Sequence, residues 1–292
     1  MANSGGINGD VTPFYDKATG TITYVVADPS SKSCAVIDPV LDYDAKSGRT
    51  STDSVERVGD FIRQQGLAVA LILETHVHAD HMTGARHVQA NFGGKRGIGS
   101  EIVAVQQTFA AVFNLSAAIA ADGSEFDYVF KDEARVPLGE LELEVLHTPG
   151  HTPACVCYRV GDAVFTGDTV FMPDFGTARC DFPGGDARTL YASIRRILSL
   201  AEDTRVFVGH DYGRENRAPA WETTIAAERA TNIHVGDAVT EDDFVQMREK
   251  RDAELAYPNL ILPSIQVNIR GGAFPEPEAN GVSYLKIPLN AV

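Results

Sequence analysis

Cysteines and long apolar runs are both scarce in this chain. Only 4 of its 292 residues are cysteine, and they show no pair spacing of the zinc-binding kind. We therefore expect reduced thiols in a cytoplasmic protein. No apolar run approaches the length of a membrane span, and the N-terminal residues lack the charged and apolar regions of a secretory signal. Neither a membrane anchor nor export is expected.

Basic residues are also in short supply. The chain has 25 Lys and Arg against 40 Asp and Glu, which gives a formal net charge of -15. Such a surface would not attract nucleic acid or an anionic membrane, so neither is expected as a partner. A small anionic substrate needs only a local positive spot and stays compatible with this charge. A hydrophobic content of 44% is that of a globular protein with a substantial core.

Histidine, by contrast, is concentrated in one short stretch, THVHADH at 75–81. It contains three histidines and one aspartate: His76, His78, Asp80 and His81. Imidazole and carboxylate are ligands that borderline divalent metals prefer. The apolar run 67–73 directly before it has the pattern of a buried strand, so these side chains should leave a rigid strand end. The stretch predicts a metal site, with a histidine-rich surface loop as the alternative.

Three later motifs each follow a predicted strand. They are HTPGHT with His151, TGDT with Asp168 and GHDY with His210. An aspartate beside a glycine could, on its own, be only a turn residue. Because strand ends that converge on one edge of a sheet give the geometry that a site needs, we expect the motifs to meet there.

Apolar patterning predicts two strand-rich halves, each followed by helices. Strands are expected at 21–27, 34–38, 67–73, 141–146, 155–160, 163–165 and 205–208. Helices are expected at 54–65, 82–92, 101–120, 186–200, 218–231 and 241–255. Residues 42–52 are predicted as a loop, with Asp53 or Ser54 as the following helix cap, and a Pro-rich tail begins at residue 258. The simplest organisation is one catalytic domain, 1–215, with a C-terminal extension, 216–292, packed on it.

The order HxHxDH, HTPGHT, GD and GH resembles the metallo-β-lactamase superfamily over about residues 20–215. That resemblance implies an α/β (α+β) fold, an αββα sandwich with the extension added. It also implies two sets of metal ligands. His76, His78 and His151 resemble those of a first metal, and Asp80, His81 and His210 those of a second, with Asp168 able to bridge both.

Further segments resemble the persulfide dioxygenases (sulfur dioxygenases), relatives of the glyoxalase II hydrolases. These segments are FTGD at 165–168, ARCDF at 178–182, TLY at 189–191, HDY at 210–212 and LAYP at 255–258. This branch implies one Fe(II) per chain, held by His76, His151 and Asp168. A 2-His-1-carboxylate face leaves positions open for substrate and dioxygen. The other four ligand-type residues would then orient ligands or bound water, or hold a second metal: His78, Asp80, His81 and His210.

The implied reaction oxidises glutathione persulfide with O2 and water to sulfite and glutathione. Arg179 is expected to grip a glutathione carboxylate, and Tyr212 to donate a hydrogen bond to the substrate. A solvated surface arginine and a wall tyrosine are the plain alternatives. Cys180 has no basic partner at a recognisable spacing, so an inert or pocket-lining thiol is expected.

All seven ligand-type residues would equally allow a dinuclear metal thioester hydrolase of the glyoxalase II type, which is the main alternative. A non-catalytic persulfide or metal sensor that keeps the fold is a third. A homo-dimer or homo-oligomer is expected through the apolar segments 260–262 and 265–269 of the extension.

Overall fold

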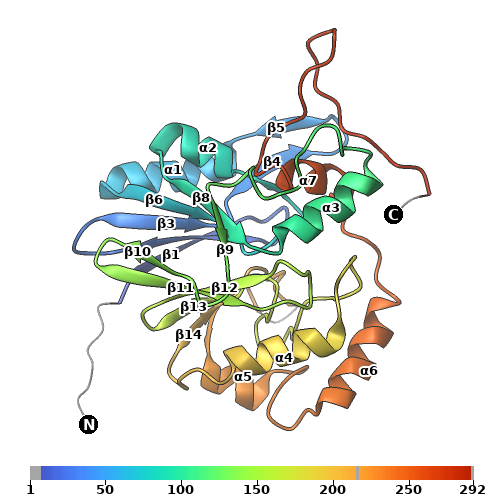
Figure 1. Ribbon diagram of the computed structural model, residues 1–292. Helices are drawn as coiled ribbons and strands as arrows, with labels where there is room; N and C mark the ends of the chain where they lie inside the picture. The colour runs from blue at the N-terminus through green and yellow to red at the C-terminus, as the bar shows by residue number, and fades with distance from the viewer. Residues whose placement is uncertain (1–7, 215–216, 291–292) are drawn as a thin grey trace.

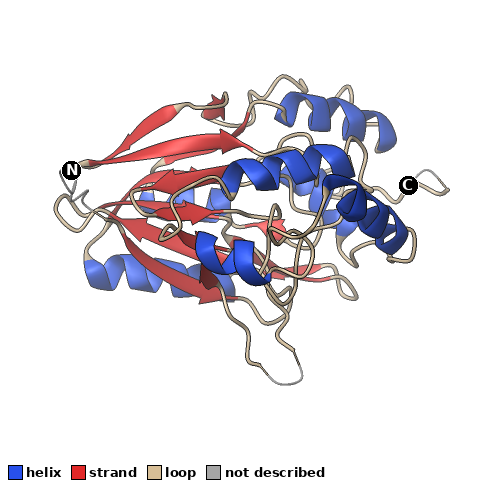
Figure 2. Cartoon of the chain, turned by 90° about the horizontal axis from the view of Figure 1, so that it is seen from below, coloured by secondary structure: helices blue, strands red, loops and turns tan. Residues whose placement is uncertain are grey.

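Two six-stranded sheets form the centre of the molecule, and helices cover their outer faces (Figures 1 and 2). The computed structural model describes residues 8–214 and 217–290. The expected αββα sandwich is confirmed. Within the described part of the chain, each helix is too short or too polar to span a bilayer.

The first sheet has the strand order β1-β2-β3-β6-β8-β9. Its strands are β1 (Asp10–Tyr15), β2 (Ile22–Ala27), β3 (Ser33–Ile37), β6 (Ala68–Leu73), β8 (Lys95–Gly99) and β9 (Tyr128–Phe130). From β3 to β9 the strands run parallel. Helices α1 (Asp53–Gln65) and α2 (Ala85–Phe92) lie on the outer side of this sheet (Figure 1). The N-cap of α1 is Thr52 rather than Asp53 or Ser54.

The second sheet has the order β10-β11-β12-β13-β14-β15. Its strands are β10 (Arg135–Leu138), β11 (Leu141–His147), β12 (Val156–Val160), β13 (Ala163–Phe165), β14 (Arg205–Phe207) and β15 (Glu222–Thr224). Helices α4 (Ala187–Ile197), α5 (Ile225–Thr231) and α6 (Glu241–Asp252) lie on its outer side (Figure 1). The side chain of Asp186 caps α4 by accepting a hydrogen bond from the Thr189 amide, which fixes where this helix begins.

Aromatic side chains fill the space between the sheets. Tyr24 of the first sheet packs against Phe165 of the second at 5.2 Å between ring centroids. Its hydroxyl donates to the Val208 carbonyl, and the hydroxyl of Tyr158 donates across to the Glu74 carbonyl at 2.8 Å. Buried tyrosines need such partners. Their hydrogen bonds therefore tie the strand ends of the two sheets together at the edge where the site lies.

Some elements differ from the sequence prediction. Residues 42–52 are not a plain loop, because β4 (Val40–Asp44) and β5 (Arg49–Ser51) form a hairpin there. Both faces of β5 are polar and exposed, so the strand lacks the alternation of apolar and polar residues by which a strand is predicted. β7 (Met82–Thr83) pairs with β4 where a helix start was expected, and β15 replaces the start of the predicted helix at 218–231. Helix α3 (Ile102–Val112) is shorter than predicted.

The Pro-rich tail contains a further helix, α7 (Ile261–Asn268). Ile261, Ile265 and Ile269 are buried in the chain's own core beside α3. The segments 260–262 and 265–269, which were expected to form a subunit interface, therefore pack within the chain itself. The oligomeric state stays a prediction. At the end of α7, Asn268 donates from Nδ2 to the carbonyls of His78 and His81, both at 2.8 Å.

Candidate metal centre

Four strand ends deliver the four motifs to one place. His76 follows β6, His151 follows β11, Asp168 follows β13 and His210 follows β14. All three imidazoles are buried. The expectation that the motifs meet at one sheet edge is confirmed.

Two glycines make this convergence possible. Gly150 has a φ of +139°, and a Cβ built on it would meet the Leu190 backbone of α4 at 2.3 Å, so only glycine lets the turn before His151 lie against that helix. A Cβ on Gly209 would meet the backbone of Gly167 at 2.8 Å. The TGDT and GHDY loops can therefore pack backbone to backbone, which brings their aspartate and histidine into contact.

Three groups face one point. Nε2 of His76 lies 3.9 Å and Nε2 of His151 lies 3.7 Å from Oδ2 of Asp168. Burial lowers the pKa of His76 well below its ordinary value, and burial also lowers the pKa of His151. Both imidazoles are therefore neutral, which is the form that binds metal. The donor set and its spacing fit one divalent cation.

Hydrogen bonds fix which nitrogen of each imidazole faces that point. Nδ1 of His151 donates to the Arg179 carbonyl at 2.7 Å, which leaves Nε2 with its lone pair. Thr75 donates its hydroxyl proton to Asp38, so its oxygen can only accept from Nδ1 of His76 at 3.0 Å. Both rings are thus held in the tautomer that a metal requires.

His210 joins two carboxylates. Its Nδ1 donates to Oδ1 of Asp168 and its Nε2 to Oδ2 of Asp80, both at 2.7 Å. Burial alone would lower the pKa of His210, but Asp168 and Asp80 raise it well above its ordinary value. Burial alone would raise the pKa of Asp168, but His210 holds it well below its usual range. Asp168 is therefore ionised and turned so that Oδ2 faces the two histidines.

A second group of donors lies beside the first: His78, Asp80 and His81. His81 donates from Nδ1 to Asp80 at 3.2 Å. Within residues 8–214 and 217–290, Nδ1 of His78 and Nε2 of His81 are buried without a hydrogen-bond partner. Such orphaned nitrogens are costly unless something pairs with them, and bound metal would do so.

Two acids that the sequence interpretation missed hold His78. Its Nε2 lies 3.0 Å from Oδ1 of Asp38 and 3.3 Å from Oε2 of Glu74. Glu74 is only 4% exposed, and burial raises its pKa. Glu74 directly follows an apolar run, where a charged residue usually marks the exposed end of a strand, so its burial could not be predicted from the sequence. Asp38 also follows a strand end, directly before a proline, and that pattern could have identified it.

A cavity of about 320 Å³ opens over this centre, and Asp80, His151 and Asp168 line its floor. Phe171, Phe175, Phe182 and Tyr212 are among its other lining residues. Tyr212 is 57% exposed, and its ring lies 6.1 Å from that of His210. Its expected hydrogen bond to substrate stays a prediction.

Arg179 also lines the cavity, but its guanidinium is already engaged. Asp181 accepts from its Nε and Nη2, both at 2.6 Å, and the Ala256 carbonyl accepts from Nη1. The guanidinium lies over the rings of Phe182 and Tyr257. The two guanidinium nitrogens of Arg179 that were expected to bind a substrate carboxylate are thus already hydrogen-bonded to Asp181.

The thiol of Cys180 is buried, and burial raises its pKa. Its sulfur lies 3.5 Å from Oδ2 of Asp252, a neighbour that disfavours a thiolate. An inert thiol was expected, and these surroundings agree with it. The other three cysteines are likewise buried and free.

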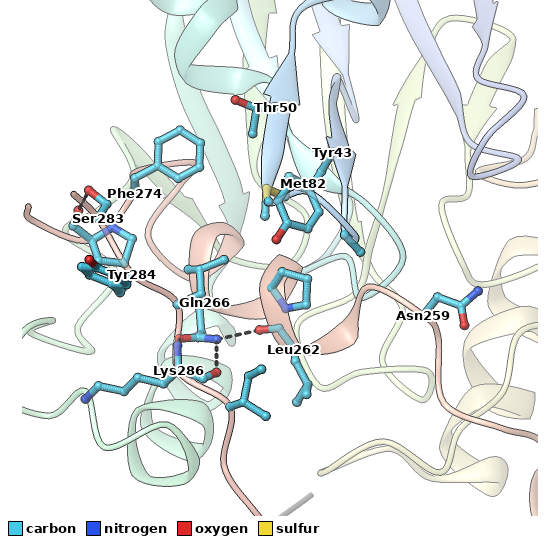
Figure 3. A pocket seen from close by; sticks show the side chains of 16 residues that line it. Tyr43, Thr50, Met82, Asn259, Leu262, Gln266, Phe274, Ser283, Tyr284 and Lys286 are labelled. Atoms are coloured by element: carbon cyan, nitrogen blue, oxygen red, sulfur yellow. Dashed lines mark hydrogen bonds between the residues drawn. The ribbon is translucent and has the colours of Figure 1, made fainter.

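A larger cavity, of about 540 Å³, lies between α7, the β4–β5 hairpin and residues 274–287 (Figure 3). Gln266 closes one side of it by bonding to both the amide and the carbonyl of Lys286. None of its lining residues is a histidine, cysteine or carboxylate. The chemistry therefore belongs to the smaller cavity.

Comparisons with known proteins agree with this geometry. The model of the Metallo-beta-lactamase superfamily matches residues 18–210. The chain is 51% identical to a probable metallo-hydrolase of Burkholderia pseudomallei, over 97% of this chain and 99% of that protein. It is 48% identical to glyoxylase B2 of Dictyostelium discoideum, over 96% of each.

More distant matches carry a different name. The chain is 29% identical to the mitochondrial persulfide dioxygenase ETHE1 of Homo sapiens, over 88% of this chain and 87% of that protein. Among solved structures, ETHE1 from Myxococcus xanthus matches with a TM-score of 0.73 and 27% identity, over 90% of this chain and all 100% of that one.

Proposed function

This chain belongs to the metallo-beta-lactamase superfamily, and on that premise we propose that it is an iron-dependent persulfide dioxygenase. Its substrate would be glutathione persulfide, with one Fe(II) per chain bound by His76, His151 and Asp168. The proposal is supported by the persulfide dioxygenase relatives, which match over most of both chains.

One observation carries the choice of a single metal. His210 engages Asp80 and Asp168 with its two ring nitrogens, a role in which it would position carboxylates rather than bind a cation itself. What remains facing a common point is two neutral imidazoles and one carboxylate oxygen. That set is the face used by non-haem Fe(II) oxygenases.

When bound, iron would supply the electron-transfer route that dioxygen needs to react with a closed-shell sulfur anion. Overall, glutathione persulfide, O2 and water give glutathione, sulfite and two protons. The terminal sulfur gains three oxygen atoms and loses four electrons, which dioxygen takes up. The bond between the two sulfurs breaks, and the glutathione sulfur leaves as the thiol.

The chain's own residues prepare the site for this reaction. His210, which is hydrogen-bonded through both ring nitrogens, keeps Asp168 ionised and keeps its Oδ2 turned toward His76 and His151. The rings of Phe171, Phe175 and Phe182 line the cavity, and their apolar surfaces would limit the access of water to a reactive sulfur anion. Tyr212 lines the cavity and is 57% exposed, so its hydroxyl would be available to donate a hydrogen bond to the substrate.

A second candidate is a dinuclear thioester hydrolase of the glyoxalase II type. The orphaned nitrogens of His78 and His81 favour it, because in a dinuclear site His78 would bind the first cation and His81 the second. The names of the Burkholderia and Dictyostelium relatives favour it as well.

Metal analysis after anaerobic purification separates the two candidates. We expect one iron per chain, oxygen uptake with glutathione persulfide and one sulfite formed for each O2 consumed. Asp168→Ala should abolish both iron and uptake, whereas Asp60→Ala, which changes an exposed carboxylate on α1, should leave both intact. Two metals per chain with turnover of S-lactoylglutathione and no oxygen uptake would overturn the proposal.

A further inference from the structure

Three arginines line the cavity over the metal centre, and two of them are paired. Arg179 is held by Asp181, as described above. Arg248 is buried and donates to Oδ1 of Asp252 at 2.9 and 2.6 Å. The third, Arg251, lies in the last turn of α6 and is exposed. Within the described ranges, no ion pair or side-chain hydrogen bond involves its guanidinium.

Positive charge is concentrated on this side of the cavity. His234 lies behind the wall, where its Nδ1 accepts from the Thr177 amide at 3.0 Å. The pKa of His234 is lowered to about 4, first by burial and then by the nearby charges of Arg248, Arg251 and Arg214. In a chain with a net charge of -15, this is the local positive spot that an anionic substrate requires.

The same cavity contains the metal-binding groups. His151 and Asp168 line it together with Arg251, and the rings of Phe171, Phe175 and Phe182 also face it. A molecule lying along the cavity would meet the metal centre with one end and a cation with the other, and its middle would pack against aromatic rings. That pattern suits a thiol with a remote carboxylate.

We propose that Arg251 is the carboxylate anchor of this site and restricts the enzyme to persulfides of thiols that carry a carboxylate away from the sulfur. This inference rests on the proposed function and assigns to Arg251 the role first expected of Arg179. A guanidinium matches a carboxylate with two parallel hydrogen bonds, and an arginine without an internal partner has that face available.

The test combines two substrates with matched variants. Arg251→Gln and Lys250→Gln remove the same charge from adjacent exposed positions of α6, but Lys250 does not line the cavity. With glutathione persulfide, Arg251→Gln should raise KM about tenfold, which is about 1.4 kcal/mol. Its kcat should stay near the wild-type value. With the persulfide of 2-mercaptoethanol, which has no carboxylate, KM should not change.

Lys250→Gln should behave as wild type with both substrates, and Arg251→Lys should recover part of the loss. Calorimetric titration with glutathione gives a readout without turnover, in which Arg251→Gln should weaken binding by a similar factor. An unchanged KM for glutathione persulfide, or an equal loss with both substrates, would overturn the anchor. If wild type consumes no oxygen with either persulfide, the proposed function fails, while the glutathione titration still decides the anchor.

Discussion

Weakening the pair between Arg179 and Asp181 should loosen the metal centre although neither side chain is a proposed metal ligand. The carbonyl of Arg179 accepts a hydrogen bond from Nδ1 of His151. The guanidinium of Arg179 holds this backbone in place by donating to Asp181 and to the Ala256 carbonyl. The perturbation is Asp181→Asn, which keeps the size of the side chain and removes its charge.

The magnitude follows from the contacts. Hydrogen bonds to charged groups are worth about 1.5–3 kcal/mol each when water is excluded. The Asp181 side chain is 32% exposed, so solvent reduces the expected loss of unfolding free energy to about 1–2 kcal/mol for the pair. Loss of an outer hydrogen-bond partner of a ligating histidine weakens metal binding by about 10–100-fold. Because the Arg179 carbonyl is retained here, we expect the lower end, about tenfold.

Anaerobic competition with a chromophoric chelator measures the metal affinity, and the visible spectrum of Co(II)-loaded protein reports the ligand geometry. Asp60→Asn, which removes an exposed partner of Arg63 on α1, serves as the control and should match wild type in both assays. A variant that loses stability but binds metal with wild-type affinity would refute the reasoning, since the pair would then have no role in holding His151.

Two further predictions concern buried polar groups. Burial raises the pKa of Glu228 to about 8 from 4.5, so folding takes up a proton between these values and stability falls as the pH rises through that range. Glu228→Gln should therefore raise the urea midpoint at pH 8.5 and have little effect at pH 4.5; an equal effect at both would argue against a buried ionisable group. Asn268→Ala removes partners from three buried backbone groups and should cost about 2–4 kcal/mol of unfolding free energy, with exposed Asn259→Ala as the neutral comparison. Equal urea curves for the two asparagine variants would contradict this.

The ligand-bearing edge of the fold could be predicted because its signals are local. A ligand motif directly follows each of the strands β6, β11, β13 and β14. The strand ends and the candidate metal ligands could therefore be predicted from the same short segments. In the second sheet β13 and β14 pair in parallel, and β11 and β13 are both antiparallel to β12, so these three strands end at the same edge. The sequence alone did not distinguish Asp168 from an ordinary turn residue, and its contacts with two histidines favour the ligand interpretation.

The missed features depend on how side chains pair in the folded chain. Asp181 lies only two residues from Arg179, but the sequence does not show that it pairs with that guanidinium, or that the exposed Arg251 of α6 lines the same cavity. Glu74 is buried only because His78 and Thr83 turn back onto it. The hairpin of β4 and β5 is too short and polar for periodicity to reveal, and it gains its partner from β7, which lies after the histidine stretch.

The hydrogen bonds from Asn268 to the carbonyls of His78 and His81 have a consequence for biosynthesis. The histidine-rich loop leaves the ribosome about 190 residues before the asparagine that holds it. A domain generally folds as a unit, so this loop does not reach its final structure before the rest of the domain has been synthesised. Capture of the cation in its final geometry is then a late step, which follows the arrival of α7.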